Sequence, residues 1–334
     1  MEDMLPIIWG VLIATGVFVY VALDGFDLGI GILFPLGKTK AERDQMMNSV
    51  APVWDGNETW LVLGGGGLFA VFPLAYSVLL TAFYAPVMVM LAGLIFRGVA
   101  FEFRFKDGRH RGAWDLAFMG GSLAAAFSQG IMLGAFIQGV AVDGRSYAGG
   151  WWDWLTPFTV FTGFATVAGY ALLGATWLNW KTDGDLQARM KQIAPWLAGT
   201  VLAAIGIVSL ITPSLHPEIA ARWFGGFNAV LLAPLPIATV AVAALLVLSV
   251  RKGRELAPFL AAEAMFLLSF IGVGVTTYPY IIPRAVRLED AAGPASSLGF
   301  LLVGTVVLLP MVLGYTAYSY WVFRGKVRLG EGYH

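Results

Sequence analysis

Acidic residues occur in spaced pairs inside segments that are otherwise strongly apolar. Asp24 and Asp27 lie three positions apart in ALDGFDLGIGIL, and Asp55 and Glu58 have the same spacing in WDGNETWLVL. Residues three apart on a helix share a face, about 5–6 Å from each other. Carboxyl groups held partly out of water can accept and release protons near neutral pH. We therefore predict that these four acids belong to a proton pathway.

One arginine falls inside an apolar run of the same part of the chain. Arg97 lies in VMVMLAGLIFRGVAFEF, and Glu102 follows it within the same run. An unpaired buried charge is strongly destabilising, so Arg97 needs acidic partners. We predict that Arg97 is the charge partner of the acids and that Glu102 joins the proton pathway.

Helix capping is an alternative explanation for some of these acids. Asp55 and Asp115 each stand near the start of an apolar segment, where an acid favours a helix N-terminus. Capping is the favoured interpretation for Asp115. It explains neither Glu58, one turn deeper than Asp55, nor Asp24, which lies several residues inside its segment. Both interpretations stay open for Asp55 and Glu58.

The composition indicates an integral membrane protein. Of 334 residues, 58% are hydrophobic and only 13% are charged, whereas soluble domains carry about 25% charged residues. The mean hydropathy is +0.75. A net charge of zero gives no indication of nucleic-acid binding, and the absence of cysteine excludes disulfides and thiolate metal sites. Any chemistry must therefore lie within the membrane, at its faces, or on a partner chain.

A membrane-spanning helix needs about 20 mostly apolar residues, and the chain contains nine such candidates. They cover residues 7–35, 54–73, 75–103, 113–140, 155–180, 194–212, 223–250, 258–282 and 297–323. The second is short, rich in glycine and joined to the third by a turn at Phe72-Pro73, so it could be partly broken. The predicted fold is an all-α polytopic membrane protein with about nine transmembrane helices.

Basic residues alternate between the connections of these spans. Sixteen of the 21 lysines and arginines fall in every second connection or after the last span, and the other connections hold only Arg145, Arg222, Arg284 and Arg287. Basic connections stay in the cytoplasm. The pattern predicts an N-terminus outside, a cytoplasmic C-terminus, and an acid cluster in the cytoplasmic leaflet.

Histidine is absent from every predicted span. The three histidines, His110, His216 and His334, lie in connections or at the C-terminus. Haem iron is held most often by histidine, and zinc and copper sites also require clustered ligands. We therefore predict no metal site on this chain and no cofactor bound directly by it.

Two amides lie in the fourth predicted span. Gln129 and Gln138 are nine positions apart in SQGIMLGAFIQG. Amides and small residues are typical of tight helix contacts in membranes. Helix packing is the favoured role, and contact with a quinone, a lipid or a polar pathway is the alternative.

Four long blocks carry a family resemblance. They are ALDGFDLGIGIL, NSVAPVWDGNETWLVLGGGGLFAVFP, FRGVAFEFRFK and GAFIQGV. In this order and spacing they resemble subunit II of the cytochrome bd-type quinol oxidases, including the cyanide-insensitive branch. The blocks cover the first 140 residues, and the later spans agree in number, spacing and hydropathy.

The resemblance implies an architecture, a location and partners. It implies one transmembrane domain over residues 1–334 of a bacterial cytoplasmic (inner) membrane protein. Two four-helix bundles are expected, the first over about 1–140 and further helices over about 150–325, with one peripheral helix. The expected partner in a heterodimer is a larger subunit I that carries the haems, b and d or b only. A small single-span accessory subunit and membrane lipids are further candidate partners.

The resemblance also implies an activity and roles for individual residues. The family oxidises quinol and reduces dioxygen to water with protons from the cytoplasm. Asp55 corresponds to the acid proposed to join the cytoplasmic proton path, and Asp27 and Arg97 to residues associated with oxidase integrity or the haem environment. Some members hold a structural quinone in this subunit, for which Trp54 and Trp60 are candidate flanking residues.

Three functions compete for this pattern. The favoured one is a haem-free oxidase subunit that supports subunit I and contributes to proton uptake. The second is a purely structural scaffold, in which the acids only pair with Arg97 and cap helices. The third is a proton-coupled secondary transporter, which is disfavoured because transporter sites usually lie near the membrane midplane.

Overall fold

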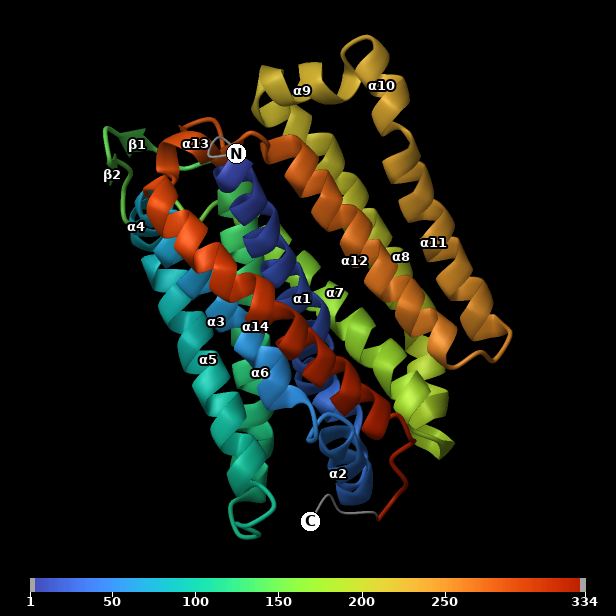
Figure 1. Ribbon diagram of the computed structural model, residues 1–334. Helices are drawn as coiled ribbons and strands as arrows, with labels where there is room; N and C mark the ends of the chain where they lie inside the picture. The colour runs from blue at the N-terminus through green and yellow to red at the C-terminus, as the bar shows by residue number, and fades with distance from the viewer. Residues whose placement is uncertain (1–3, 331–334) are drawn as a thin grey trace.

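The computed structural model describes residues 4–330, and these residues are almost entirely helical (Figure 1). The long helices are α1 (Leu5–Leu33), α3 (Trp54–Val71), α5 (Tyr84–Phe103), α6 (Arg111–Gln138), α7 (Pro157–Lys181), α8 (Gly184–Leu215), α11 (Pro234–Arg251), α12 (Leu256–Thr277) and α14 (Ala295–Val322). The short helices are η2 (Phe34–Leu36), α2 (Lys40–Asn48), α4 (Pro73–Ala82), α9 (Pro217–Phe224), α10 (Phe227–Leu232) and α13 (Leu288–Ala291). The predicted all-α class is confirmed.

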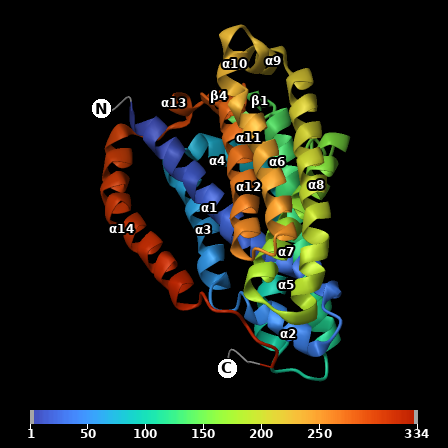
Figure 2. The same ribbon diagram turned by 90° about the vertical axis from the view of Figure 1, so that its right-hand side faces the viewer.

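Two small antiparallel hairpins complete the described part of the chain. In the first, β1 (Val142–Asp143) pairs with β2 (Ser146–Tyr147), so that Val142 faces Tyr147. In the second, β3 (Tyr280–Ile282) pairs with β4 (Val286–Arg287) across an irregular register. Both hairpins lie at the end of the molecule where α1 begins, as the labels of β1 and β4 show (Figure 2).

Eight segments of the described residues are long and apolar enough to cross a membrane. They are α1 extended through η2, α5, α6, α7, α8, α10 with α11, α12 and α14. Helix α3 is not among them, and its sequence contains Asp55, Glu58 and four consecutive glycines. It packs along α1 in the bundle (Figure 1). The multi-pass architecture is confirmed, and α3 as a ninth span stays a prediction.

The third predicted span is not one helix. The chain from Pro73 to Phe103 forms α4 and α5, with a break at Phe83. Pro86 explains the break, because a proline ring clashes with the carbonyl four residues earlier, and that residue is Ala82, the last of α4. The predicted turn at Phe72-Pro73 is present, since α3 ends at Val71 and α4 begins at Pro73.

Two later boundaries also differ from the predicted ones. Helix α8 begins at Gly184 rather than near residue 194, because helical structure continues through polar turns that an apolar window does not detect. The span predicted at 223–250 is divided, so that α10 and α11 follow the separate helix α9. Prolines open both α9 and α11, as expected for a residue whose missing N–H is not needed in the first turn.

Basic segments gather at one end of the bundle, which we call the basic end. It contains α2, the end of α7 with Lys181, the connections at 104–110 and 252–255, and the segment 323–330 after α14 (Figure 1). Helix α1 begins at the opposite end, and α14 finishes at the basic end (Figure 1). The orientation of the basic end toward the cytoplasm stays a prediction.

Helix α1 lies at the centre of the packing. It contacts α3, α6 and α7, while α5 packs on α6, α7 on α8, and α11 on α12. Helix α14 crosses the outside of the bundle and stands apart from it in the second view (Figure 2). This is the position of a peripheral helix. The division into two bundles near residues 140–150 stays a prediction.

Glycines set the distance between α1 and α7. A Cβ atom on Gly29 would lie 1.9 Å from the carbonyl oxygen of Tyr170, and one on Gly174 would meet the backbone of Gly29. Only glycine allows backbones to approach this closely. The close crossing holds the half of α1 that carries Asp24 and Asp27 firmly inside the bundle.

Candidate functional site

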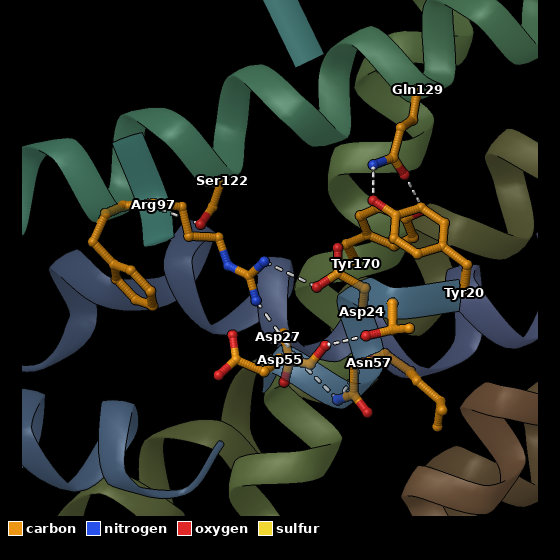
Figure 3. Close-up of polar contacts among 12 residues, drawn as sticks. Tyr20, Asp24, Asp27, Asp55, Asn57, Arg97, Ser122, Gln129 and Tyr170 are labelled. Atoms are coloured by element: carbon orange, nitrogen blue, oxygen red, sulfur yellow. Dashed lines mark hydrogen bonds and ion pairs between the residues drawn. The ribbon is translucent and has the colours of Figure 1, made fainter. Parts of the chain in front are cut away.

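The candidate site is a buried cluster of two carboxylates and one guanidinium (Figure 3). Arg97 Nη1 lies 2.9 Å from Asp24 Oδ1, and Arg97 Nη2 lies 3.6 Å from Asp27 Oδ2. All three side chains have an exposed fraction of 0%. The predicted pairing of Arg97 with the acids of α1 is therefore present in the structure. We call these three residues the Asp24–Asp27–Arg97 cluster.

Helix geometry and small residues bring the cluster together. The three-residue spacing places Asp24 and Asp27 on one face of α1. Arg97 comes from α5, and a Cβ atom on Gly121 of α6 would lie 3.0 Å from the backbone nitrogen of Arg97. The close approach of α5 to α6 leaves no room for solvent around the start of this side chain. Its guanidinium is directed toward α1.

Asn57 is a fourth member of the site that the sequence interpretation missed. Its Nδ2 donates to Asp27 Oδ2 at 2.8 Å, and also lies 3.4 Å from the carbonyl oxygen of Leu23. The hydroxyl of Tyr320, on the peripheral helix α14, donates to Asn57 Oδ1 at 2.8 Å. The available sequence signal for Asn57 was an amide residue in the first turns of an apolar segment. No sequence signal linked Tyr320 to it.

Gln129 joins two tyrosines next to the cluster (Figure 3). Its Nε2 donates to the hydroxyl oxygen of Tyr20 at 2.8 Å, and Tyr170 donates to its Oε1 at 2.6 Å. Tyr20 lies one helical turn before Asp24 on α1. Gln129 thus links α6 to α1 and α7, as expected for the packing role. Its alternative role in quinone or lipid contact stays a prediction.

The remaining predicted pathway acids lie closer to the basic end. Asp55 is exposed in the first turn of α3, and Glu58 is half-buried one turn further along. Asp55 does not cap α3, because the N-cap residue is Val53 and no side chain caps the helix. Glu102 is separate from the cluster: its side chain is 60% exposed and pairs with Lys106 at 3.0 Å.

Asp115 belongs to an ion-pair network rather than to a helix cap, so the capping interpretation was wrong. The N-cap of α6 is His110, and Asp115 lies further along the helix. Asp115 pairs with Arg43 at 2.7 Å and with Arg104 at 2.5 Å, while Arg104 also pairs with Asp44 at 2.6 Å. These contacts join α2 to the ends of α5 and α6 at the basic end.

A second ion pair fixes α2 at the basic end. Glu42 lies 2.5 Å from Arg189 of α8 and accepts from the backbone nitrogen of Lys38 at 2.7 Å. The hydrogen bond from Arg189 holds the pKa of Glu42 below its usual value. The connection between the first two apolar segments is therefore anchored to the second half of the chain.

The other predicted contact residues lie in separate places. Trp54 stacks on Phe101 with ring centroids 5.0 Å apart, and the Arg97 guanidinium carbon lies 5.9 Å from the centroid of Trp54. Trp60 is buried, with no hydrogen-bond partner for its Nε1. Gln138 accepts from the Thr156 hydroxyl at 2.9 Å. Trp54 covers the cluster, and quinone or lipid contact by any of these residues stays a prediction.

The described histidines lie apart from one another and from the Asp24–Asp27–Arg97 cluster. His110 is exposed and pairs with Asp107, and His216 lies 3.2 Å from the carbonyl oxygen of Gln138 outside the long helices. Within residues 4–330, no group of three or more His, Cys, Asp or Glu residues is placed to hold a metal. His334 lies outside the described residues.

Comparison with known proteins gives a consistent family assignment. A family model for cytochrome bd terminal oxidase subunit II matches residues 5–323. The chain is 29% identical to the cytochrome bd-I ubiquinol oxidase subunit 2 of Escherichia coli K12, covering 97% of this chain and 96% of that protein. It is 27% identical to the cytochrome bd ubiquinol oxidase subunit 2 of Bacillus subtilis 168, covering 96% of each.

A solved structure has the same fold. The bd oxidase from Geobacillus thermodenitrificans contains a chain that superposes with a TM-score of 0.78 at 17% identity, covering 96% of this chain and 98% of that one. At this identity the likeness concerns the fold alone. It agrees with the bundle described above.

Proposed function

Because the chain belongs to the cytochrome bd terminal oxidase subunit II family, we propose that its Asp24–Asp27–Arg97 cluster serves proton uptake in the assembled oxidase. The chain is a subunit of a bd-type quinol oxidase and a multi-pass protein of the bacterial inner membrane. Family membership removes the transporter alternative. The remaining question is whether the buried acids conduct protons or only stabilise the fold.

The partner and the cofactors follow from the same premise. The relatives are named subunit 2 of an oxidase, so a partner oxidase subunit is implied. We propose that this partner is a haem-bearing subunit I, forming a heterodimer that oxidises quinol and reduces dioxygen. The histidines of the described chain lie outside the bundle core and offer no haem ligand there, which supports placing the haems, b and d or b only, on the partner.

The charge count of the cluster supports a proton-carrying role. Two carboxylates face one guanidinium in a site with no exposed surface. If both acids were ionised, one negative charge would be buried without compensation, which is strongly unfavourable. A proton shared by the pair restores neutrality. This single observation carries the proposal, because an excess of buried acid over base favours the binding of a proton at the site.

The order of the acids supports a route from the basic end. Asp55 is exposed there, Glu58 lies one turn deeper on α3, and the cluster lies beside them on α1 and α5. In this route Asp55 receives a proton from cytoplasmic water, and Glu58 passes it toward Asp27. Asn57 orients the Asp27 carboxyl group by its hydrogen bond. Glu102, exposed and paired with Lys106, takes no part.

Replacement of Asp27 by asparagine tests the proposal in the assembled oxidase. We expect slower oxygen reduction, with an altered pH dependence and unchanged haem absorbance. The matched control is Asp143→Asn, the same change at an exposed position at the opposite end of the bundle. An unchanged rate and pH profile in a fully assembled Asp27→Asn oxidase would favour the scaffold role instead.

A further inference from the structure

The peripheral helix α14 is attached to the bundle mainly at its two ends. Near its start, Trp9 Nε1 of α1 donates to the carbonyl oxygen of Leu298 at 3.1 Å. Near its end, the Tyr320 hydroxyl donates to Asn57. Leu298 is the only buried residue of α14, a helix that is described over its whole length, and nine of the ten residues at 306–315 are exposed. The middle of α14 therefore makes little contact with the helices behind it (Figure 2).

A groove of about 490 Å³ lies between the last turns of α14 and the helices α1, α7 and α12. Nine of its twelve lining residues are alanine, leucine, phenylalanine or tryptophan, among them Phe26, Trp177, Leu260 and Ala317. Glu263 also lines the groove, but both of its carboxyl oxygens are inaccessible to solvent, so this residue presents carbon atoms to the open space. A surface of this kind favours an apolar occupant.

The size and the lining of the groove favour an acyl chain over other apolar molecules. A transmembrane helix is about 10–12 Å across with its side chains, which is too wide for a groove of this volume. A quinone ring carries carbonyl oxygens that need hydrogen-bond donors when they are buried. The Tyr320 hydroxyl and Trp177 Nε1 already donate to Asn57 and Ser49. An acyl chain needs no polar partner, and the hydrocarbon core of the bilayer supplies it.

Basic side chains lie beside the end of the groove. The groove reaches Leu256, the first residue of α12, which follows the connection that contains Lys252 and Arg254. Both of these basic residues are exposed. Glu255, the acid in this connection, is already paired with Lys326 at 2.6 Å. The exposed cations of this connection therefore stand next to the apolar groove without a neutralising partner in it.

Lys181 places a further positive charge against the wall of the groove. Its Nζ lies 4.5 Å from the centroid of the Trp180 ring and 5.0 Å from that of Trp177, and both rings line the groove. Lys181 donates to the carbonyl oxygens of Phe323 and Gly325 rather than to a carboxylate. The chain segments at this end, 181–185, 251–256 and 320–328, contain seven basic residues and three acids. Their excess positive charge attracts an anionic lipid headgroup.

We propose that this groove is a binding site for an anionic phospholipid, with one acyl chain in the groove and the headgroup at the basic end near Lys252, Arg254 and Arg324. The acyl chain fills the space between α14 and the bundle, where the protein supplies little packing of its own. The basic residues determine which end of the lipid lies at which end of the groove. This inference concerns lipid binding and does not depend on the proposed role of the cluster in proton uptake.

Native mass spectrometry of the purified, assembled oxidase tests the groove. The oxidase is stripped of lipid in detergent and incubated with phosphatidylglycerol. Ala317→Trp places a large ring in the groove, and we expect this variant to bind one phosphatidylglycerol fewer than the wild type. The matched control is Ala244→Trp, the same change at an exposed position on α11, which does not line the groove; it should bind as many as the wild type. Equal binding by the wild type and the Ala317→Trp variant would overturn the proposal.

Competition between two lipids tests the headgroup position. The stripped oxidase is incubated with an equimolar mixture of phosphatidylglycerol and phosphatidylcholine that have the same acyl chains. A basic residue near the headgroup strengthens the binding of an anionic lipid by about fivefold. The double variant Lys252→Gln/Arg254→Gln should therefore reduce the preference for phosphatidylglycerol by about fivefold or more. Arg145→Gln, at an exposed position at the opposite end, should leave it unchanged. An unchanged preference in the double variant rejects the anionic headgroup at this place.

Two further observations keep the test decisive. If Ala317→Trp does not assemble, Leu260→Trp fills the groove from α12, and the same loss of one lipid is required of it. If the molecule that either variant loses from the oxidase as isolated has the mass of a quinone, the phospholipid assignment is wrong. None of these substitutions changes the Asp24–Asp27–Arg97 cluster, so the proposal for proton uptake is still decided by Asp27→Asn alone.

Discussion

Arg97 and Asp24 face each other across the boundary of α5 and α1, with Nη1 and Oδ1 2.9 Å apart and no exposed surface on either side chain. Asp27 completes the site from the next turn of α1. One arginine therefore neutralises only part of the acidic charge that the bundle buries. The stability of the fold depends on this pairing, and the proposed role in proton uptake depends on the imbalance.

Removal of the Arg97 charge should strongly destabilise the subunit. Arg97→Gln leaves two buried carboxyl groups without a cation, and breaking such a pair costs about 3–5 kcal/mol. We expect a lower thermal unfolding midpoint for the purified oxidase, measured in detergent. Arg97→Lys should recover part of the loss because it restores the charge without the planar two-nitrogen geometry. A wild-type midpoint for Arg97→Gln would show that the pairing is unimportant.

Asp55→Asn should slow turnover without changing assembly. Asp55 is exposed and has no partner that its loss would leave buried, so we expect unchanged haem absorbance and stability. If it collects protons for the cluster, oxygen consumption with excess quinol should fall by roughly tenfold or more. The measurement is made from pH 6 to pH 8. Normal turnover over that whole range would remove Asp55 from the pathway.

Asn57→Leu should destabilise the site by removing the contacts that α3 makes with it. The substitution removes the donor to Asp27 and the acceptor for Tyr320. A hydrogen bond to a charged group contributes about 1.5–3 kcal/mol, so the loss should exceed that of Tyr320→Phe, which removes only the second bond. Thermal unfolding of both variants gives the comparison. Equal midpoints would mean that the contact with Asp27 contributes nothing.

Gly29→Ala should disrupt the crossing of α1 and α7. The new Cβ would lie 1.9 Å from the Tyr170 carbonyl oxygen, a backbone atom that cannot rotate away. Overpacking of this kind costs about 1–3 kcal/mol or more. Gly65→Ala is the control, since nothing lies within 4 Å of its added Cβ. If Gly29→Ala reduced stability no more than Gly65→Ala does, the packing described here would be contradicted.

The Glu42–Arg189 pair should make stability depend on pH in the acidic range. The pKa of Glu42 is lowered in the folded state by the hydrogen bond from Arg189. The contribution of the pair to the free energy of unfolding is therefore fully present above the unfolded pKa of Glu42, about 4.3. It is lost as the pH falls through the lower pKa of Glu42 in the folded state. At pH 7, the Glu42→Gln variant should have a lower unfolding midpoint than the wild type. In acid, the difference between the two midpoints should become smaller. A constant difference at all pH values would exclude ionisation of Glu42 as the cause.

Much of the fold and part of the site could be predicted because they depend on the types and spacing of residues close together in the sequence. Apolar runs and alternating basic connections located eight confirmed span candidates, and the three-residue spacing placed Asp24 and Asp27 on one helix face. The break at Phe83 was missed because the composition on its two sides is equally apolar, and only the clash of the Pro86 ring with the carbonyl of Ala82 ends the helix there.

Tertiary contacts determined which of the polar residues belong to the site. The sequence alone identified the membrane class, the family blocks and the need of Arg97 for acidic partners, since these follow from hydrophobicity, charge and spacing. Only the packed bundle showed that Arg97 meets Asp24 and Asp27 while Glu102 remains exposed, and that Asn57 and Tyr320 complete the site. The reason is physical: helix periodicity fixes the face a residue occupies, whereas its partner depends on how separate helices cross.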